Sequence, residues 1–313
     1  MILCIGLSPA VQRTLLFDGF ALGQVNRARE TLITASGKAV NVARVLLQLD
    51  GSPHLVQLIG GDSGRFVTAS LDAMGLGHTS VRVHNDAPTR TCVTLLSDRD
   101  GPTEIVEEVR PVNSDDIHAL RAAARPLIPH ARALCLSGSF PEGVPAPFYA
   151  DLIREANHLG VVTIVDAQNA PLKEALAARP FLVKPNLEEA LGTLGLSRTD
   201  DAEADGVRAV TALREAGAEW ALVSLGRTGS LLGGEDRFWK VESPKVEAVN
   251  AIGSGDSLTA GLVFAHIRRS KPIPEAVVFG TACAAANCLS LTSGVVNPED
   301  VRRLLPQVKI SEI

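Results

Sequence analysis

The chain is poor in aromatic residues and has no run of basic residues. Phe, Trp and Tyr make up 4% of its 313 residues, whereas hydrophobic residues together reach 46%. Abundant Ala, Val and Leu with few aromatic residues are typical of a parallel sheet covered by helices. The formal net charge is −5. A negative chain without a basic patch argues against nucleic acid as a partner.

The patterns of cysteine and histidine argue against a disulfide-bonded protein and against a metal-binding protein. The five cysteines are odd in number and scattered: Cys4, Cys92, Cys135, Cys283 and Cys288. They are expected to be buried, reduced thiols and not disulfides. No cysteine has a partner at zinc-ligand spacing, and no two histidines stand four apart. A structural zinc site or a metalloenzyme site is therefore not expected.

Long hydrophobic runs are also missing. No stretch reaches the roughly 18 uninterrupted apolar residues of a membrane span. Residues 1–7, M-I-L-C-I-G-L, lack a basic start and lead directly into polar residues. This pattern indicates a first buried strand and not a signal peptide. We therefore expect a cytoplasmic protein without a membrane partner.

Short apolar runs alternate with amphipathic stretches, which predicts repeated βα units. Strands are expected at 2–7, 54–59, 133–137, 161–166, 181–184 and 220–224. Helices are expected at 38–49, 63–74, 147–159, 171–178, 187–194, 201–216, 257–268, 274–291 and 298–305. An α/β chain of this length can form one core. Residues 1–313 are therefore predicted to be a single α/β domain.

Two segments break this rhythm, at about 11–33 and 86–109. They alternate polar and apolar residues, as in T-R-T-C-V-T-L at 89–95. Such period-two patterning predicts strands with one face in water. The two insertions can pair into a small projecting sheet, which would act as a lid or a dimer contact. A surface hairpin without a role fits the pattern equally well.

The most informative segment is G-S-G-D at 253–256, followed by a predicted helix. Small residues let the backbone turn tightly and approach a ligand. The N–H groups at a helix start then attract anions, such as a transferring phosphoryl group. Asp256 beside such a site fits a base that deprotonates an attacking hydroxyl. Asp is also a common helix N-cap, and this segment alone favours that interpretation.

Four further segments precede this turn. They are A-S-G-K-A-V-N-V-A at 35–43, S-G-S-F-P at 137–141, K-P-N-L-E-E at 184–189 and S-L-G-R-T-G at 224–229. Each alone also fits a plain helix start, an acidic first turn or a β-turn. All five in this order resemble the signatures of the PfkB (ribokinase-like) carbohydrate kinases over nearly the whole chain. The resemblance implies a three-layer α/β/α sandwich with a mostly parallel central sheet and a small β-sheet lid.

The resemblance also implies an ATP-dependent kinase that uses Mg²⁺, and it is compatible with a monovalent cation. Asp256 would be the catalytic base, with Gly253, Ser254 and Gly255 forming the anion hole. Asn186 and Glu189 would organise magnesium. Nucleotide contacts would come from residues of the later segments: Lys184, Ser224, Gly226, Gly229 and Asn287.

Residues 6–12, G-L-S-P-A-V-Q, are similar to the T-L-N-P-A-x-D motif of the family branch that phosphorylates sugar phosphates, such as 1-phosphofructokinase and tagatose-6-phosphate kinase. By this resemblance the sugar would be contacted by Gln12, Gly37, Asn41 and Ser139. Its phosphate would be held by Arg27, Lys38 and Arg90, since a guanidinium can bind two phosphate oxygens at once. Two residues depart from the pattern: Gln12 replaces a carboxylate with a neutral amide, and Ala251 stands where Thr or Pro is usual.

Two other functions remain open at this point. A kinase for a free sugar or a nucleoside would need no contact to a substrate phosphate. A non-catalytic sugar- or nucleotide-binding regulator is the other, although a base beside an anion site argues against it. A homodimer through the projecting sheets is compatible with the resemblance.

Overall fold

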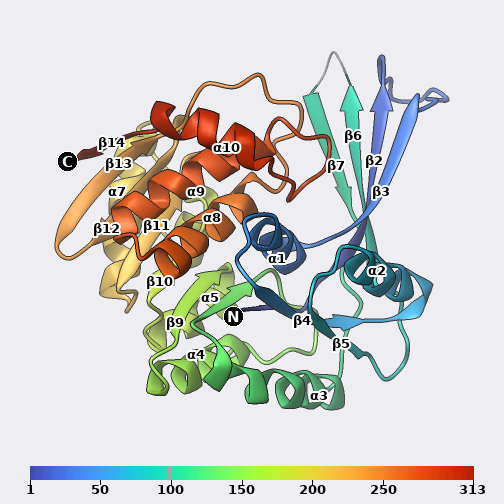
Figure 1. Cartoon of the computed structure of the whole chain (residues 1–313), viewed down its shortest axis with the longest axis horizontal. Helices are drawn as coiled ribbons and strands as arrows, with labels where there is room; N and C mark the ends of the chain where they lie inside the picture. Colours follow the sequence, from blue (N-terminus) through green and yellow to red (C-terminus); the bar gives the residue numbers. More distant parts are fainter. Residues whose placement is uncertain (98–100) are drawn as a thin grey trace.

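The structure is a computed structural model that describes residues 1–97 and 101–313. Its main element is a ten-stranded sheet in the order β14-β13-β12-β11-β10-β9-β8-β1-β4-β5 (Figure 1). The strands from β11 through β10, β9, β8, β1 and β4 to β5 are parallel, while β12, β13 and β14 add antiparallel pairs at one side. The strand bounds are β1 Ile2–Gly6, β4 Pro53–Ile59, β5 His78–Arg82, β8 Ala133–Ser137, β9 Val162–Asp166, β10 Leu182–Val183, β11 Trp220–Ser224, β12 Ser230–Gly234, β13 Arg237–Glu242 and β14 Lys309–Glu312.

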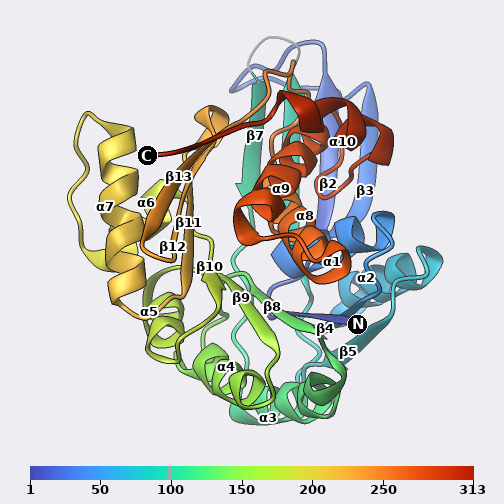
Figure 2. The ribbon, with the colours of Figure 1, turned by 60° about the vertical axis from the view of Figure 1, so that its left-hand side comes forward.

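Helices cover both faces of this sheet, as Figure 2 shows. One layer contains α1 Lys38–Gln48, α2 Gly61–Ala73, α8 Ser254–Arg269, α9 Ile273–Asn287 and α10 Pro298–Leu304. The other contains α3 Ser114–Ala124, α4 Phe148–His158, α5 Asn169–Ala177, α6 Leu187–Leu194 and α7 Ala202–Glu215. Three 3₁₀ turns complete the described chain at Arg125–His130, Gly226–Thr228 and Leu305–Gln307.

The central strand β1 shows why two helical layers are needed. Ile2 and Cys4 belong to the core under one layer, while Leu3 and Ile5 belong to the core under the other. Alternate side chains of a strand point to opposite faces, so a strand that is apolar at every position must be covered twice. The predicted three-layer sandwich with a mostly parallel central sheet is confirmed.

A second, four-stranded sheet stands apart from the large one, at the upper right of Figure 1. Its order is β3-β2-β6-β7, with β2 Ala10–Phe17, β3 Glu30–Ser36, β6 Arg90–Ser97 and β7 Gly101–Val106. The parallel pair β2–β6 joins two hairpins that are more than 50 residues apart in sequence. Strands therefore form within both predicted insertions and pair with each other; residues 98–100 of the second insertion lie outside the described residues.

Candidate active site

A cleft of about 410 Å³ lies between the small sheet and the carboxyl ends of the parallel strands. Asp166, Lys184 and Ser224 reach it from the ends of β9, β10 and β11, where ligands collect in open parallel sheets. Its lining includes most of the residues that the sequence singled out: Gln12, Gly37, Lys38, Asn41, Arg90, Lys184, Asn186, Glu189, Ser224 and the four residues 253–256. Segments from the whole length of the chain thus meet at one site.

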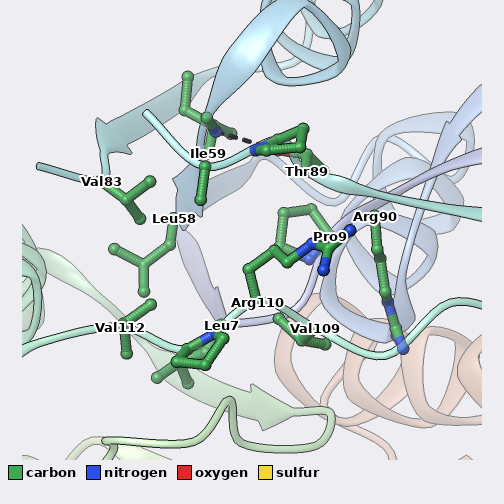
Figure 3. A pocket seen from close by; sticks show the side chains of 14 residues that line it. Leu7, Pro9, Leu58, Ile59, Val83, Thr89, Arg90, Val109, Arg110 and Val112 are labelled. Atoms are coloured by element: carbon green, nitrogen blue, oxygen red, sulfur yellow. Dashed lines mark hydrogen bonds between the residues drawn. The ribbon is translucent and has the colours of Figure 1, made fainter. Parts of the chain in front are cut away.

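A second hollow lies next to the cleft but is far smaller, at about 30 Å³ (Figure 3). Apolar side chains such as Leu7, Leu58 and Val83 line it, and Arg90 stands at its border with the cleft. This volume holds little more than a water molecule. Of the two, the large cleft is the one that can accept a sugar or a nucleotide.

The turn before α8 forms one wall of the cleft. Gly253 has a left-handed backbone with φ 82°, and it is the N-cap residue of α8. A side chain there would collide with the backbone of Ser293 and Gly294, at 3.2 and 2.8 Å from its Cβ. Among the described residues no side chain caps this helix, and the Ser254 N–H donates to the Ala251 carbonyl at 3.2 Å, which leaves the N–H groups of Gly255 and Asp256 available to an anion. Asp256 is the third helical residue, and the alternative that it serves as the N-cap is wrong.

The Asp256 side chain is buried, with 7% of its surface exposed. One carboxylate oxygen accepts a 2.8 Å hydrogen bond from Nδ2 of Asn41 on α1. Burial raises the pKa of Asp256 to about 6, helped by the nearby charge of Asp166 and opposed by Lys38, Asn41 and Lys184. A carboxylate with this pKa is ionised at neutral pH yet basic enough to accept a proton.

Asp166 is the residue that sequence reasoning missed. It is 1% exposed, and its two carboxylate oxygens lie 2.7 Å from Lys38 Nζ and 3.1 Å from Lys184 Nζ. Burial favours the neutral form, but Lys184 and then Lys38 outweigh it and lower the pKa of Asp166 to about 2. We call Asp166, Lys38 and Lys184 the buried ion cluster. The sequence did indicate a site position for Asp166, because it is the last residue of the predicted strand 161–166 and ligands collect at such strand ends.

Lys38 and Asn41 have more partners inside the protein than the sequence suggested. Lys38 Nζ also lies 3.4 Å from Glu189. Burial lowers the pKa of Lys38, but the nearby carboxylates of Asp166, Glu189 and Asp256 outweigh burial and raise the pKa above its ordinary value. Asn41 donates to Asp256 while its Oδ1 accepts from the Ser36 hydroxyl at 3.2 Å. Both atoms of the Asn41 amide are therefore engaged, and the residue orients the carboxylate of Asp256.

Asn186 and Glu189 form a reciprocal capping box at the start of α6. The Asn186 side chain accepts from the Glu189 N–H at 2.8 Å, and Glu189 Oε2 accepts from the Asn186 N–H at 2.9 Å. Among the described residues, no group of three or more His, Cys, Asp or Glu is arranged to hold a metal ion. Magnesium needs only one or two carboxylates when substrate phosphates and water complete its shell, so Glu189 at the cleft wall fits such an ion.

Five of the predicted site residues do not line the cleft: Arg27, Ser139, Gly226, Gly229 and Asn287. Arg27 is exposed in the connection between β2 and β3, and exposed Ser139 lies 3.4 Å from the Ser8 hydroxyl. Asn287 is fully buried, and its amide bonds Ser257, Ile252 and Gly294. It thus secures the turn before α8 and, being fully buried, does not line the cleft.

Comparison with known proteins agrees with this geometry. The profile of the family described as pfkB family carbohydrate kinase matches residues 1–300. The tagatose-6-phosphate kinase of Staphylococcus epidermidis is 28% identical over 315 residues, covering 100% of both chains. The structure of phosphofructokinase-2 from Escherichia coli in complex with potassium superposes with a TM-score of 0.86 at 24% identity, covering 98% of both chains. A possible 1-phosphofructokinase from Thermotoga maritima gives a TM-score of 0.89 at 21% identity, covering 100% of this chain and 99% of the other.

Proposed function

Since the chain belongs to the pfkB family of carbohydrate kinases, we propose that it transfers the γ-phosphoryl group of ATP to a hydroxyl of a sugar phosphate, with Asp256 as the base. The observation that carries the proposal is the placement of Asp256. It is a buried carboxylate with a pKa of about 6, held by Asn41 at the uncapped start of α8. The relation to a tagatose-6-phosphate kinase over the full chain supports a phosphorylated ketohexose as the acceptor.

In the proposed reaction the Asp256 carboxylate takes the proton of the acceptor hydroxyl. The acceptor oxygen forms a bond to the γ-phosphorus while the bond between that phosphorus and the β,γ-bridging oxygen breaks, and ADP leaves. The N–H groups of Gly255 and Asp256 stabilise the charge on the transferring group, because they lack partners among the described residues at the start of α8 and both residues line the cleft.

The buried ion cluster places two ammonium groups on the same wall of the cleft. Lys38 and Lys184 both line it, and Asp166 fixes their positions. We propose that they attract the phosphates of the nucleotide and the transferring group. Glu189 and Asn186 would hold Mg²⁺, which neutralises phosphate charge when bound. A monovalent cation remains a further proposal, motivated by the potassium complex of the E. coli relative.

Arg90 is the candidate for the phosphate that the acceptor already carries. Its Nε is buried and finds no hydrogen-bond partner among the residues that the structure describes. Its terminal nitrogens reach the carbonyl oxygens of Ser8 and Glu107 only at 3.4 Å, which is long for a hydrogen bond. A guanidinium that is so weakly engaged at the border of the cleft has donors left for an anion.

Arg90→Ala is expected to raise KM for a sugar phosphate about tenfold to a hundredfold, because a charged hydrogen bond is lost. The KM for MgATP should not change. Arg13→Ala is the matched control, since Arg13 lies on β2 but is exposed and outside the cleft. Equal KM values for wild type and Arg90→Ala with every phosphorylated acceptor would instead favour a free-sugar or nucleoside kinase.

We propose that the small sheet mediates a homodimer. Leu22 and Val25, in the connection between β2 and β3, are 89% and 80% exposed, and Ile105 on β7 is 55% exposed. Leu22 and Val25 would contribute apolar contacts to such an interface from the connection, and Ile105 from the edge strand β7. Arg27 lies in the same connection, so in this dimer it would contact the second subunit and not the cleft of its own subunit. The E. coli relative phosphofructokinase-2 has been solved as a tetrameric inhibited form.

In analytical ultracentrifugation we expect the wild type to sediment as a dimer and Leu22→Asp/Val25→Asp as a monomer with an unchanged circular dichroism spectrum. Leu159→Asp serves as the control, because Leu159 is 50% exposed at the end of α4, outside the small sheet. A monomeric wild type would refute the dimer.

A further inference from the structure

A polar row crosses the cleft face of the small sheet. Gln12 on β2 is 3% exposed, and its Nε2 donates a 2.8 Å hydrogen bond to Oγ1 of Thr94 on β6. Thr94 pairs directly with Glu104 on β7 in the strand register. Gln12 and Glu104 both line the cleft, so this row ends in a carboxylate that faces the acceptor side.

Gln12 has limited capacity at this position. One N–H of its amide is engaged by Thr94, which leaves one N–H as a donor and the neutral Oε1 atom as the only acceptor that Gln12 offers a ligand. A single neutral acceptor is a weak partner for a sugar, whose hydroxyls are donors that favour charged oxygen atoms. The strand β2, A-V-Q-R-T-L-L-F, therefore provides no charged acceptor on this face of the cleft.

Glu104 on β7 can provide a charged hydrogen-bond acceptor on this face of the cleft. Within residues 1–97 and 101–313 its carboxylate makes no hydrogen bond and no salt bridge, although it lines the cleft. Partial burial raises the pKa of Glu104, and the positive charge of Arg90 opposes this shift. Glu104 is exposed to the solvent of the cleft, so a ligand with hydroxyl groups can replace the water molecules around its carboxylate and donate to it.

We propose that Glu104 determines acceptor specificity by accepting hydrogen bonds from sugar hydroxyls, in the place of the carboxylate that Gln12 lacks. This inference rests on the proposed function and deepens it. Two oxygens can accept from two neighbouring hydroxyls, so the acceptor class is a sugar phosphate with adjacent free hydroxyls that face β7. Arg90, on the next strand, holds the phosphate of the same molecule. Glu104 thus contacts the acceptor and leaves the nucleotide untouched.

The test compares Glu104→Gln with Glu108→Gln, which removes the same charge from an exposed residue outside the cleft. Calorimetric titration with a ketohexose monophosphate and with its deoxy analogues measures binding without the need for turnover. Glu104→Gln should weaken binding of the full sugar phosphate about fivefold to tenfold, because a charged hydrogen bond becomes a neutral one. The deoxy analogue that lacks the hydroxyl bound by Glu104 should bind the variant and the wild type equally. The affinity for ATP should not change.

The double variant Gln12→Asp/Glu104→Gln returns one carboxylate to the row and should regain part of the lost affinity. Equal binding by Glu104→Gln and Glu108→Gln, with normal binding by the wild type, would overturn the role of Glu104 and leave the proposed function intact. If the wild type binds no sugar phosphate at all, both the role of Glu104 and the proposed function are overturned.

Discussion

Asp256→Asn is expected to lower kcat by about a hundredfold to ten-thousandfold, the usual effect of removing a positioned general base. Asparagine has nearly the same shape and can keep a hydrogen bond to Asn41, but it cannot take a proton from the acceptor. The KM values for both substrates should change much less, because the side chain acts on the reacting hydroxyl. Steady-state ADP release gives the measurement, and full turnover by the purified variant would refute the assignment.

The same substitution should not destabilise the protein. The folded-state pKa of Asp256 is raised from 3.8 to about 6, so between these values the folded state binds more protons than the unfolded state. The free energy of unfolding therefore falls as the pH rises through this window, by up to about 3 kcal/mol. Since the substituted asparagine side chain carries no charge, the melting temperature of Asp256→Asn at a pH of about 7.5 should equal or exceed that of the wild type. For the wild type, kcat/KM should fall as the pH drops below about 6.

Asp166→Asn should have the largest effect on stability. It leaves the buried Lys184 ammonium, whose side chain is 4% exposed, and the Lys38 ammonium without their shared carboxylate. Breaking a buried ion pair by removing one partner costs about 3–5 kcal/mol. Activity should fall as well, because both lysines line the cleft. Thermal and urea unfolding would measure the loss.

The matched control is Asp236→Asn, at a fully exposed residue 3.6 Å from Arg214, where a loss of no more than about 1 kcal/mol is expected. The pH dependence gives a second readout. Because the pKa of Asp166 is lowered to about 2, its stabilisation is present above pH 3.8 and is lost as the pH falls towards 2. If Asp166→Asn were as stable as Asp236→Asn, the buried ion cluster would not hold this wall of the cleft together.

Most of the parallel sheet could be predicted from the sequence because its central strands are short and apolar, whereas the parallel edge strand β5, H-T-S-V-R, is only partly buried and was not predicted. The predicted segments 133–137 and 220–224 coincide with β8 and β11, and 187–194 coincides with α6. The antiparallel strands β12 to β14 were not predicted, for physical reasons. The strand β12 ends in two glycines, and Gly234 is needed because any side chain there would collide with Trp220. All four residues of β14 are exposed, so no buried alternation reveals the strand.

Much of the cleft could also be predicted, because each signature is local in sequence. What the sequence did not reveal are partnerships across the chain. Asp166 and Lys38 are 128 residues apart, and Asn41 and Asp256 are 215 residues apart. Such pairs exist only once the sheet brings the strand ends together. For Asn287 the resemblance implied a nucleotide contact that the structure does not show. Its buried amide instead forms hydrogen bonds with Ser257, Ile252 and Gly294 around the turn before α8.

The most direct test of phosphoryl transfer to a sugar phosphate is acceptor-dependent ADP release by the wild-type protein. The protein would be given MgATP and a panel of ketohexose monophosphates, the corresponding free sugars and nucleosides. We expect ADP release well above the acceptor-free rate with at least one ketohexose monophosphate, and not with the free sugars or nucleosides. Turnover with only a free sugar or a nucleoside would contradict the acceptor assignment. Nucleotide binding without ADP release for any acceptor would contradict the proposed kinase activity itself.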